Sequence, residues 1–252
     1  GMGKVNSAMT LQAILMDDRF DFSNAYIIST GCAGSAIEYG VMGDVFVITA
    51  TVDFDLGHHA DARDLTTDLA TTWFHDESYD DASAKLLDQE LCEKVFNLVK
   101  DVQIETTEKT RAFMAATFDN ADWAIRDPKV LRGTTVTADN YWKGMHDHAN
   151  ALLMTETYGC PDPYALTEME DHAMSVVLDR LGMLDRYIII RDSVNTDVFM
   201  NGASPESLWD PNFVDSLASE SSVESADIFA TAMKNNFTVG HVVIDAILNG
   251  EL

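Results

Sequence analysis

The stretch Tyr164-Ala-Leu-Thr-Glu-Met-Glu-Asp-His-Ala173 decides the fold of this 252-residue chain. A short apolar run ends in a cluster of carboxylates, and a helical pattern of mostly apolar residues begins at once. The members of that pattern are Met169, His172, Ala173, Val176, Val177 and Leu181. Gly182 follows them, in a position where helices commonly end. The stretch therefore predicts a strand that leads directly into a helix, the junction at which α/β folds place ligand sites.

Two carboxylates, Glu168 and Glu170, lie at this predicted junction. A carboxylate can accept hydrogen bonds from two adjacent hydroxyls, which suits it to a vicinal diol such as that of a sugar. Negative charge is also favoured at the start of any helix, so a pair of solvated glutamates is the competing interpretation. The motif by itself leaves both interpretations open.

The size and composition of the chain are typical of a globular protein. The hydrophobic fraction is 46% and the charged fraction is 23%, which are ordinary values. The length suits one large α/β domain or two small ones. No apolar run is long enough to span a bilayer, and residues 1–16 lack the ordered sections of a signal peptide. We therefore expect no membrane span and a cytoplasmic location, with an exported form if a signal has been left out before residue 1.

The net charge is strongly negative, at −26, with 42 acidic and 16 basic residues. Nucleic-acid binding requires a basic footprint on the protein, so the sequence predicts no nucleic-acid partner. Solubility or salt tolerance explains this charge better than an acidic binding surface does. In such an acidic chain, Arg63 and Arg191 are expected to neutralise nearby carboxylates rather than to bind an anionic ligand.

Cysteines and histidines give no recognisable metal or disulfide motif. Cys32, Cys92 and Cys160 are widely and irregularly spaced, which fits neither a disulfide framework nor a zinc site. The candidate metal ligands are His58, His59, His146 and His148, with Asp55 and Asp61 nearby. Their spacing matches no known ligand pattern, so we expect no metal.

Strand and helix patterns alternate along most of the chain, which predicts a single α/β domain with a mostly parallel sheet. Strands are expected at residues 25–28, 44–54, 130–137 and 186–191, in addition to the run that begins at Tyr164. Residues 29–35 are expected to break the first strand. Helices are expected at residues 4–16, 82–102, 108–117, 141–158, 223–235 and 237–249. Residues 200–222 are expected to form a loop that serves as a lid.

Four predicted strand ends carry the residues of greatest interest. They are Gly1-Met-Gly-Lys-Val-Asn6, Thr30-Gly-Cys-Ala-Gly34, Glu168-Met-Glu170 and the segment from Arg191 to Asn195. In this order they resemble the nucleoside phosphorylase and nucleosidase superfamily, and within it the purine nucleoside permease branch. The resemblance extends over residues 1–249. Further branch-like stretches are Asp55-Leu-Gly-His-His-Ala-Asp-Ala-Arg63, Arg132-Gly133 and Asp139-Asn-Tyr-Trp-Lys-Gly144.

The resemblance implies a three-layer α/β/α fold around a mixed, strongly twisted sheet. It implies one phosphorylase-like domain over residues 1–252 that is incomplete at its N-terminus and lacks the opening strand. Homo-oligomers, either dimers or trimer-based assemblies, are expected from the superfamily. Its enzymes cleave the N-glycosidic bond of purine nucleosides with phosphate or water, without a cofactor, so phosphate is the one co-substrate to consider.

The resemblance also assigns roles to individual residues. Glu170 matches the ribose-binding glutamate, Met169 packs on the sugar, and Asn195 stabilises the departing base, which makes Glu170 and Asn195 the expected catalytic pair. Tyr141 matches an aromatic residue that stacks on the base. The small loop along which base or phosphate approaches the backbone comprises Thr30, Gly31, Ala33 and Gly34.

Two departures from the superfamily pattern argue against catalysis. Asn195 stands where many members have an aspartate, and an amide cannot deliver a proton. Members that favour 6-oxopurines also use asparagine, which makes inosine or guanosine the expected substrate. Ser29 stands where bacterial hexameric phosphorylases have a phosphate-binding arginine. A non-catalytic nucleoside-binding protein associated with transport is therefore the alternative function, and a metal-dependent hydrolase is a third.

Overall fold

The computed structural model describes residues 1–66, 71–199 and 216–252. A six-stranded sheet lies at its centre, in the order β5-β2-β6-β7-β1-β8. The strands are β1 (Ile27–Ser35), β2 (Val45–Asp53), β5 (Ala84–Leu86), β6 (Val130–Thr137), β7 (Tyr164–Glu168) and β8 (Tyr187–Thr196). Because β8 also pairs with β2, five of these strands close into a ring, with β5 attached outside it.

The sheet is mixed, as the superfamily resemblance implied. Parallel pairs join β1 to β8, β2 to β6 and β6 to β7. Antiparallel pairs join β1 to β7, β2 to β5 and β2 to β8. Strand β2 is buried along its whole length apart from Asp53, which is expected of a central strand covered on both faces.

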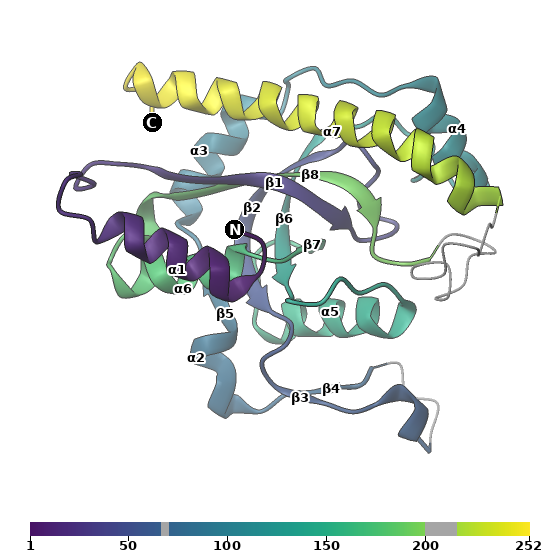
Figure 1. The fold of residues 1–252 in the computed structure, drawn as a ribbon, viewed down its shortest axis with the longest axis horizontal. Coiled ribbons are helices and arrows are strands. Elements are labelled where there is room, and N and C mark those ends of the chain that lie inside the picture. The colour runs from purple at the N-terminus through teal and green to yellow at the C-terminus, as the bar shows by residue number, and fades with distance from the viewer. Residues whose placement is uncertain (67–70, 200–215) are drawn as a thin grey trace.

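Helices cover the sheet on both sides. Figure 1 shows α7 along one side with α3 and α4, and α1, α5 and α6 on the other side. The helices are α1 (Lys4–Leu15), α3 (Gln89–Val99), α4 (Glu108–Thr117), α5 (Met145–Thr157), α6 (Asp171–Arg180) and α7 (Ser216–Leu248). Apolar side chains of β2 and β8 pack against α3 and α7 to form one part of the core. Among the described residues, no helix combines the length and apolar character needed to cross a bilayer.

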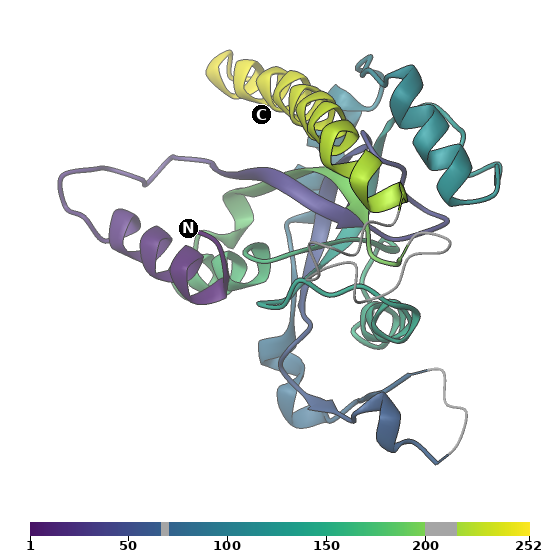
Figure 2. The ribbon, with the colours of Figure 1, turned by 45° about the vertical axis from the view of Figure 1, so that its right-hand side comes forward.

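A small arm extends from the main body. It contains the two-stranded sheet of β3 (His58–His59) and β4 (Trp73–Phe74), followed by the short helix α2 (Asp80–Ser83). Figure 2 shows this arm projecting away from the central sheet. Trp73 is buried at its base, in a cluster with Phe54 and Trp142. The arm is therefore attached to the body through packed aromatic residues.

Most predicted elements are present, and two of them, β6 and α4, have the predicted bounds. Thr107 fixes the start of α4, because its side chain accepts a hydrogen bond from the Thr110 amide. The helix predicted at residues 82–102 begins only at Gln89. There Asp88 caps α3 by accepting from the Leu91 amide at 2.7 Å. Residues 84–86 form the edge strand β5 instead.

Three further predictions are corrected. The break expected at residues 29–35 is wrong, because β1 continues through it and pairs with β8 as far as Ser35. In the same way β8 extends beyond 191 to Thr196. The two helices expected at the C-terminus are one helix, α7. Of the predicted lid loop, residues 200–215 lie outside the described residues, and residues 216–222 belong to α7.

Candidate functional site

The junction between β7 and α6 is organised around the buried carboxylate of Glu168. Its Oε2 accepts hydrogen bonds from the backbone amides of Glu170 at 2.6 Å and Asp171 at 2.7 Å. Its Oε1 accepts from the hydroxyls of Thr135 and Thr137. Burial, together with the negative charge of Asp171, raises the pKa of Glu168 to about 7. Glu168 thus caps the N-terminus of α6 with a carboxylate that is almost inaccessible to solvent.

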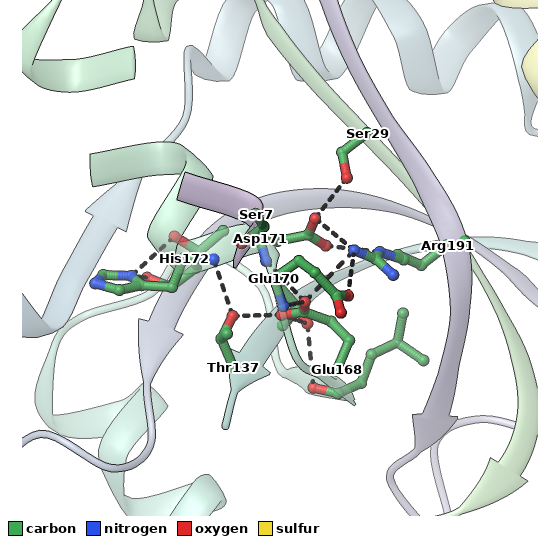
Figure 3. A network of polar contacts seen from close by, with 12 residues as sticks. Ser7, Ser29, Thr137, Glu168, Glu170, Asp171, His172 and Arg191 are labelled. Carbon is green, nitrogen blue, oxygen red and sulfur yellow. Dashed lines mark hydrogen bonds and ion pairs between the residues drawn. The ribbon is translucent and has the colours of Figure 1, made fainter. Parts of the chain in front are cut away.

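Arg191 lies at the centre of a cluster of acidic side chains (Figure 3). Its Nε and Nη2 donate to the two oxygens of Asp171 at 2.8 and 2.7 Å. Nη2 also donates to Glu170 Oε2 at 3.2 Å and lies 3.5 Å from Glu168 Oε2. The surrounding carboxylates raise the pKa of Arg191 well above its usual value, although burial opposes them. The prediction that Arg191 neutralises carboxylates is confirmed.

Glu170 lies at the edge of this cluster and retains partial exposure, with 20% of its side chain accessible. Its Oε2 accepts from Arg191, and its Oε1 accepts from the Gly3 amide at 3.2 Å. Lys4 holds the chain segment that carries Gly3, since its amine pairs with Asp53 and Asp55 at 2.8 Å each. The position of the Glu170 carboxylate is thereby fixed from two sides.

A cavity of about 260 Å³ opens beside Glu170. Its walls come from the C-terminal ends of β1, β7 and β8, from the loop after β6 and from the N-terminal segment. The lining residues that the sequence predicted for the site are Gly31, Ala33, Gly34, Tyr141, Met169, Glu170 and Asn195. Glu170 and Asn195 therefore border one space, although they lie on different segments of the chain.

Thr30 does not line this cavity. Its side chain is exposed and donates to Asn236 Oδ1 of α7 at 2.7 Å. Asn236 also donates to the carbonyl of Gly31 at 3.1 Å, so two hydrogen bonds of Asn236 join α7 to β1.

Two glycines allow the functional side chains to approach β1. A Cβ at Gly31 would lie 2.8 Å from Nη1 of Arg191, and a Cβ at Gly34 would lie 2.5 Å from Oδ1 of Asn195. Both distances are shorter than carbon atoms tolerate in such contacts. Glycine at these positions is therefore required for Arg191 and Asn195 to take the positions they have.

The cavity wall also includes Glu168, which the sequence placed at the ligand-binding junction. The lining residues to which the sequence assigned no role in the site are Met2, Cys32, Asn140, Trp142, Thr167, Arg191 and Val194. Asn140 and Trp142 are the sequence neighbours of Tyr141, a predicted site residue. That adjacency is the sequence signal by which they could have been assigned to the cavity. Trp142 stacks on Phe54 with ring centroids 5.0 Å apart. Burial raises the pKa of the Cys32 thiol, which keeps it protonated.

Tyr141 is 58% exposed and lies at the rim of the cavity. The amine of Lys143 lies 6.0 Å from the centre of its ring, a cation–π geometry. Burial lowers the pKa of Lys143 to about 8. The exposed aromatic ring offers a surface against which a planar ligand can stack.

Two of the four histidines considered as metal ligands pair with acidic side chains. His58 lies 3.2 Å from Asp76, and His148 lies 2.6 Å from Asp197. Within the described ranges, no group of three or more His, Cys, Asp or Glu residues is arranged to hold a metal ion.

Comparison with known proteins identifies relatives over most of the chain. The family model described as purine nucleoside permease matches residues 1–251. A probable purine nucleoside permease of Schizosaccharomyces pombe is 26% identical over 223 residues, which are 78% of this chain and 63% of that protein. The purine nucleoside permease of Candida albicans is 23% identical over 76% of this chain and 51% of its own length. The chain thus spans less than two thirds of the length of these curated relatives.

Solved structures share the fold. The 5′-methylthioadenosine/S-adenosylhomocysteine nucleosidase of Neisseria meningitidis, in complex with methylthio-immucillin-A, superposes with a TM-score of 0.56. It is 17% identical, and the match covers 98% of this chain and 78% of that one. The corresponding Helicobacter pylori nucleosidase gives a TM-score of 0.54 at 13% identity, over 97% of this chain and 77% of that one. At these identities the likeness shows that the fold is shared.

Proposed function

The chain belongs to the purine nucleoside permease family, and we propose that its cavity binds a purine nucleoside and cleaves the N-glycosidic bond. One observation carries this proposal. The carboxylate of Glu170 and the amide of Asn195 border the same cavity of about 260 Å³. A carboxylate suited to a vicinal diol and an amide suited to a purine base thus lie on the walls of one space.

The ribose is assigned to the side of the cavity formed by Glu170 and Met169. Cleavage of the glycosidic bond develops positive charge on the ribose. A carboxylate that accepts hydrogen bonds from the ribose hydroxyls strengthens its interaction in that transition state, so it contributes to rate as well as to binding. The buried acidic neighbours Glu168 and Asp171 outnumber Arg191, which adds to the negative potential there.

The purine is assigned to the side formed by Asn195 and Tyr141. Negative charge develops on the departing base, and the Asn195 amide can donate a hydrogen bond to it. The exposed ring of Tyr141 provides a stacking surface for any purine. An asparagine in this place supports a 6-oxopurine nucleoside, inosine or guanosine, as the substrate.

A non-catalytic nucleoside-binding role, associated with transport, is the alternative. Two observations favour it. Asn195 cannot supply a proton to the leaving base. In addition, both oxygens of Glu170 already accept hydrogen bonds, from Gly3 and Arg191.

Free base released from inosine, guanosine and adenosine separates the two functions. The enzyme function predicts release of hypoxanthine and guanine faster than adenine. Thermal stabilisation by these nucleosides with no base released supports the binding protein. Neither binding nor release of any of them would contradict the assignment of the cavity to nucleosides.

Replacing Gly34 by alanine is expected to weaken nucleoside binding by about tenfold or more, because the new methyl group displaces Asn195. Titration calorimetry with inosine measures the loss. Gly240→Ala is the matched control, since a Cβ there meets no atom within 4 Å, and it should leave affinity unchanged. If Gly34→Ala binds inosine as well as the parent protein does, Asn195 does not contact the ligand.

A further inference from the structure

The cavity borders the N-terminus of a ten-residue helix, α6, where proteins commonly bind phosphate and other anions. In this chain the position is already occupied by a side chain. Glu168 Oε2 accepts from the amides of Glu170 and Asp171 at 2.6 and 2.7 Å. The next amide, that of His172, donates to the Thr137 hydroxyl at 2.9 Å. The helix thus directs its first donors at the protein's own groups.

Arg191 is the single basic residue on the cavity wall within the described part of the chain. Its donors are likewise directed at protein acceptors. Two of them form a bidentate pair with Asp171, a third contact is to Glu170, and Nη1 lies 3.3 Å from the carbonyl oxygen of Cys32. A bidentate pair of this kind is the arrangement by which arginine would otherwise hold a phosphate.

The glycine-containing segment at residues 31–34 does not form an anion-binding loop. Such loops converge successive amides on one point and need a turn-like backbone. Here the segment is part of strand β1 and pairs with β8 from Ile27 to Ser35. At its start, Ser29 is buried and donates to Asp171 Oδ1 at 2.6 Å, so it faces the acidic cluster.

The charges around the cavity are unfavourable for a second anion. Glu168, Glu170 and Asp171 contact one guanidinium, that of Arg191, and the amine of Lys143 lies outside the cavity wall, 6.0 Å from the centre of the Tyr141 ring. The segments 67–70 and 200–226 contain no lysine or arginine in their sequence. An added phosphate would therefore lie among buried carboxylates, where repulsion is weakly screened.

We infer that the site takes an uncharged nucleoside and excludes orthophosphate, because the Glu168 carboxylate holds the place of the anion. This inference rests on the proposed nucleoside function and selects water as the acceptor. In the reaction, a water oxygen forms a bond to C1′ of the ribose while the bond from C1′ to the base nitrogen breaks. The electron pair of that bond leaves with the base, which gains one proton, and the water loses one. The products are free ribose and free purine.

The first test measures orthophosphate binding without a nucleoside. Phosphorus NMR linewidths are recorded at about pH 8, so that Glu168, whose pKa is about 7, is ionised. No broadening is expected with the parent protein. Glu168→Ala, which removes both the charge and the side chain that accepts from the α6 amides, is expected to broaden the signal. Glu108→Ala is the matched control, because its side chain is 98% exposed, and it should behave as the parent. Phosphate binding at the cavity of the parent protein, shown by broadening that inosine reverses or by a loss of inosine affinity, would overturn the inference.

The second test uses nucleosides and separates this inference from the proposed function. Inosine affinity and any base release are expected to be unchanged by added phosphate, with ribose rather than ribose 1-phosphate as the sugar product. Inosine 5′-monophosphate is expected to bind at least about tenfold more weakly than inosine at about 0.02 M salt, and the gap should narrow at about 0.5 M salt. Phosphate-dependent release of base would overturn the exclusion of phosphate but leave the nucleoside function standing. Absence of any nucleoside binding would refute the proposed function. The NMR measurement would still decide whether the cavity excludes orthophosphate.

Discussion

Glu170→Gln is expected to lower the affinity for inosine by about tenfold to a hundredfold, and the affinity for 2′-deoxyinosine by clearly less. Hydrogen bonds to a charged acceptor contribute about 1.5–3 kcal/mol, and each 1.4 kcal/mol corresponds to about tenfold. 2′-Deoxyinosine lacks one of the two ribose hydroxyls, so its affinity falls less when Glu170 is replaced. Titration calorimetry with both ligands gives the two ratios.

The comparison between the two nucleosides distinguishes a loss of diol recognition from an indirect effect of the substitution on folding. Glu170 also accepts from Arg191 and from the Gly3 amide, so thermal unfolding of the variant is measured alongside. Equal losses for inosine and 2′-deoxyinosine would mean that Glu170 supports the fold and does not recognise the diol.

Arg191→Met is expected to destabilise the protein by about 3–5 kcal/mol, the range for removal of one partner from a buried ion pair. The substitution leaves Glu168, Glu170 and Asp171 without their shared cation, and two of these carboxylates, Glu168 and Asp171, are buried. Urea unfolding measures the change in free energy.

Arg63→Met is the matched control for this substitution. Arg63 also pairs with an aspartate, Asp61, but its side chain is 88% exposed. An exposed pair contributes at most about 1 kcal/mol, so this variant should unfold close to the parent. If Arg191→Met were as stable as Arg63→Met, the acidic cluster would have to be largely uncharged in the folded protein.

Local patterns predicted much of the fold. The junction at residues 164–173 and the bounds of β6 and α4 were predicted from local sequence patterns, and the structure shows that Thr107 caps α4 where that helix was expected to begin. The closed ring of strands could not be predicted in this way, because the pairing of Val45 with Asp192 joins segments far apart in the sequence. The same limit explains the wrong break at residues 29–35, where pairing with β8 overrides a composition typical of a loop.

Less of the candidate site than of the fold could be predicted from local sequence patterns. Glu168 and Glu170 followed from the strand-to-helix junction, but Asn195 and Tyr141 came from the superfamily resemblance. Their place beside Glu170 depends on the tertiary arrangement of three strand ends. Thr30 was assigned to the site as part of a loop, whereas its side chain donates to Asn236 on α7, a contact between segments far apart in the sequence. The capping role of Glu168 could not be predicted, because it requires the amides, two threonines and Arg191 to meet at one carboxylate.

A crystal structure with inosine bound tests the central claim most directly. The account expects the nucleoside in the cavity of about 260 Å³, with both ribose hydroxyls within about 3 Å of the Glu170 carboxylate and the purine ring beside Asn195 and Tyr141. A nucleoside bound elsewhere, or bound here with its ribose turned away from Glu170, would contradict it.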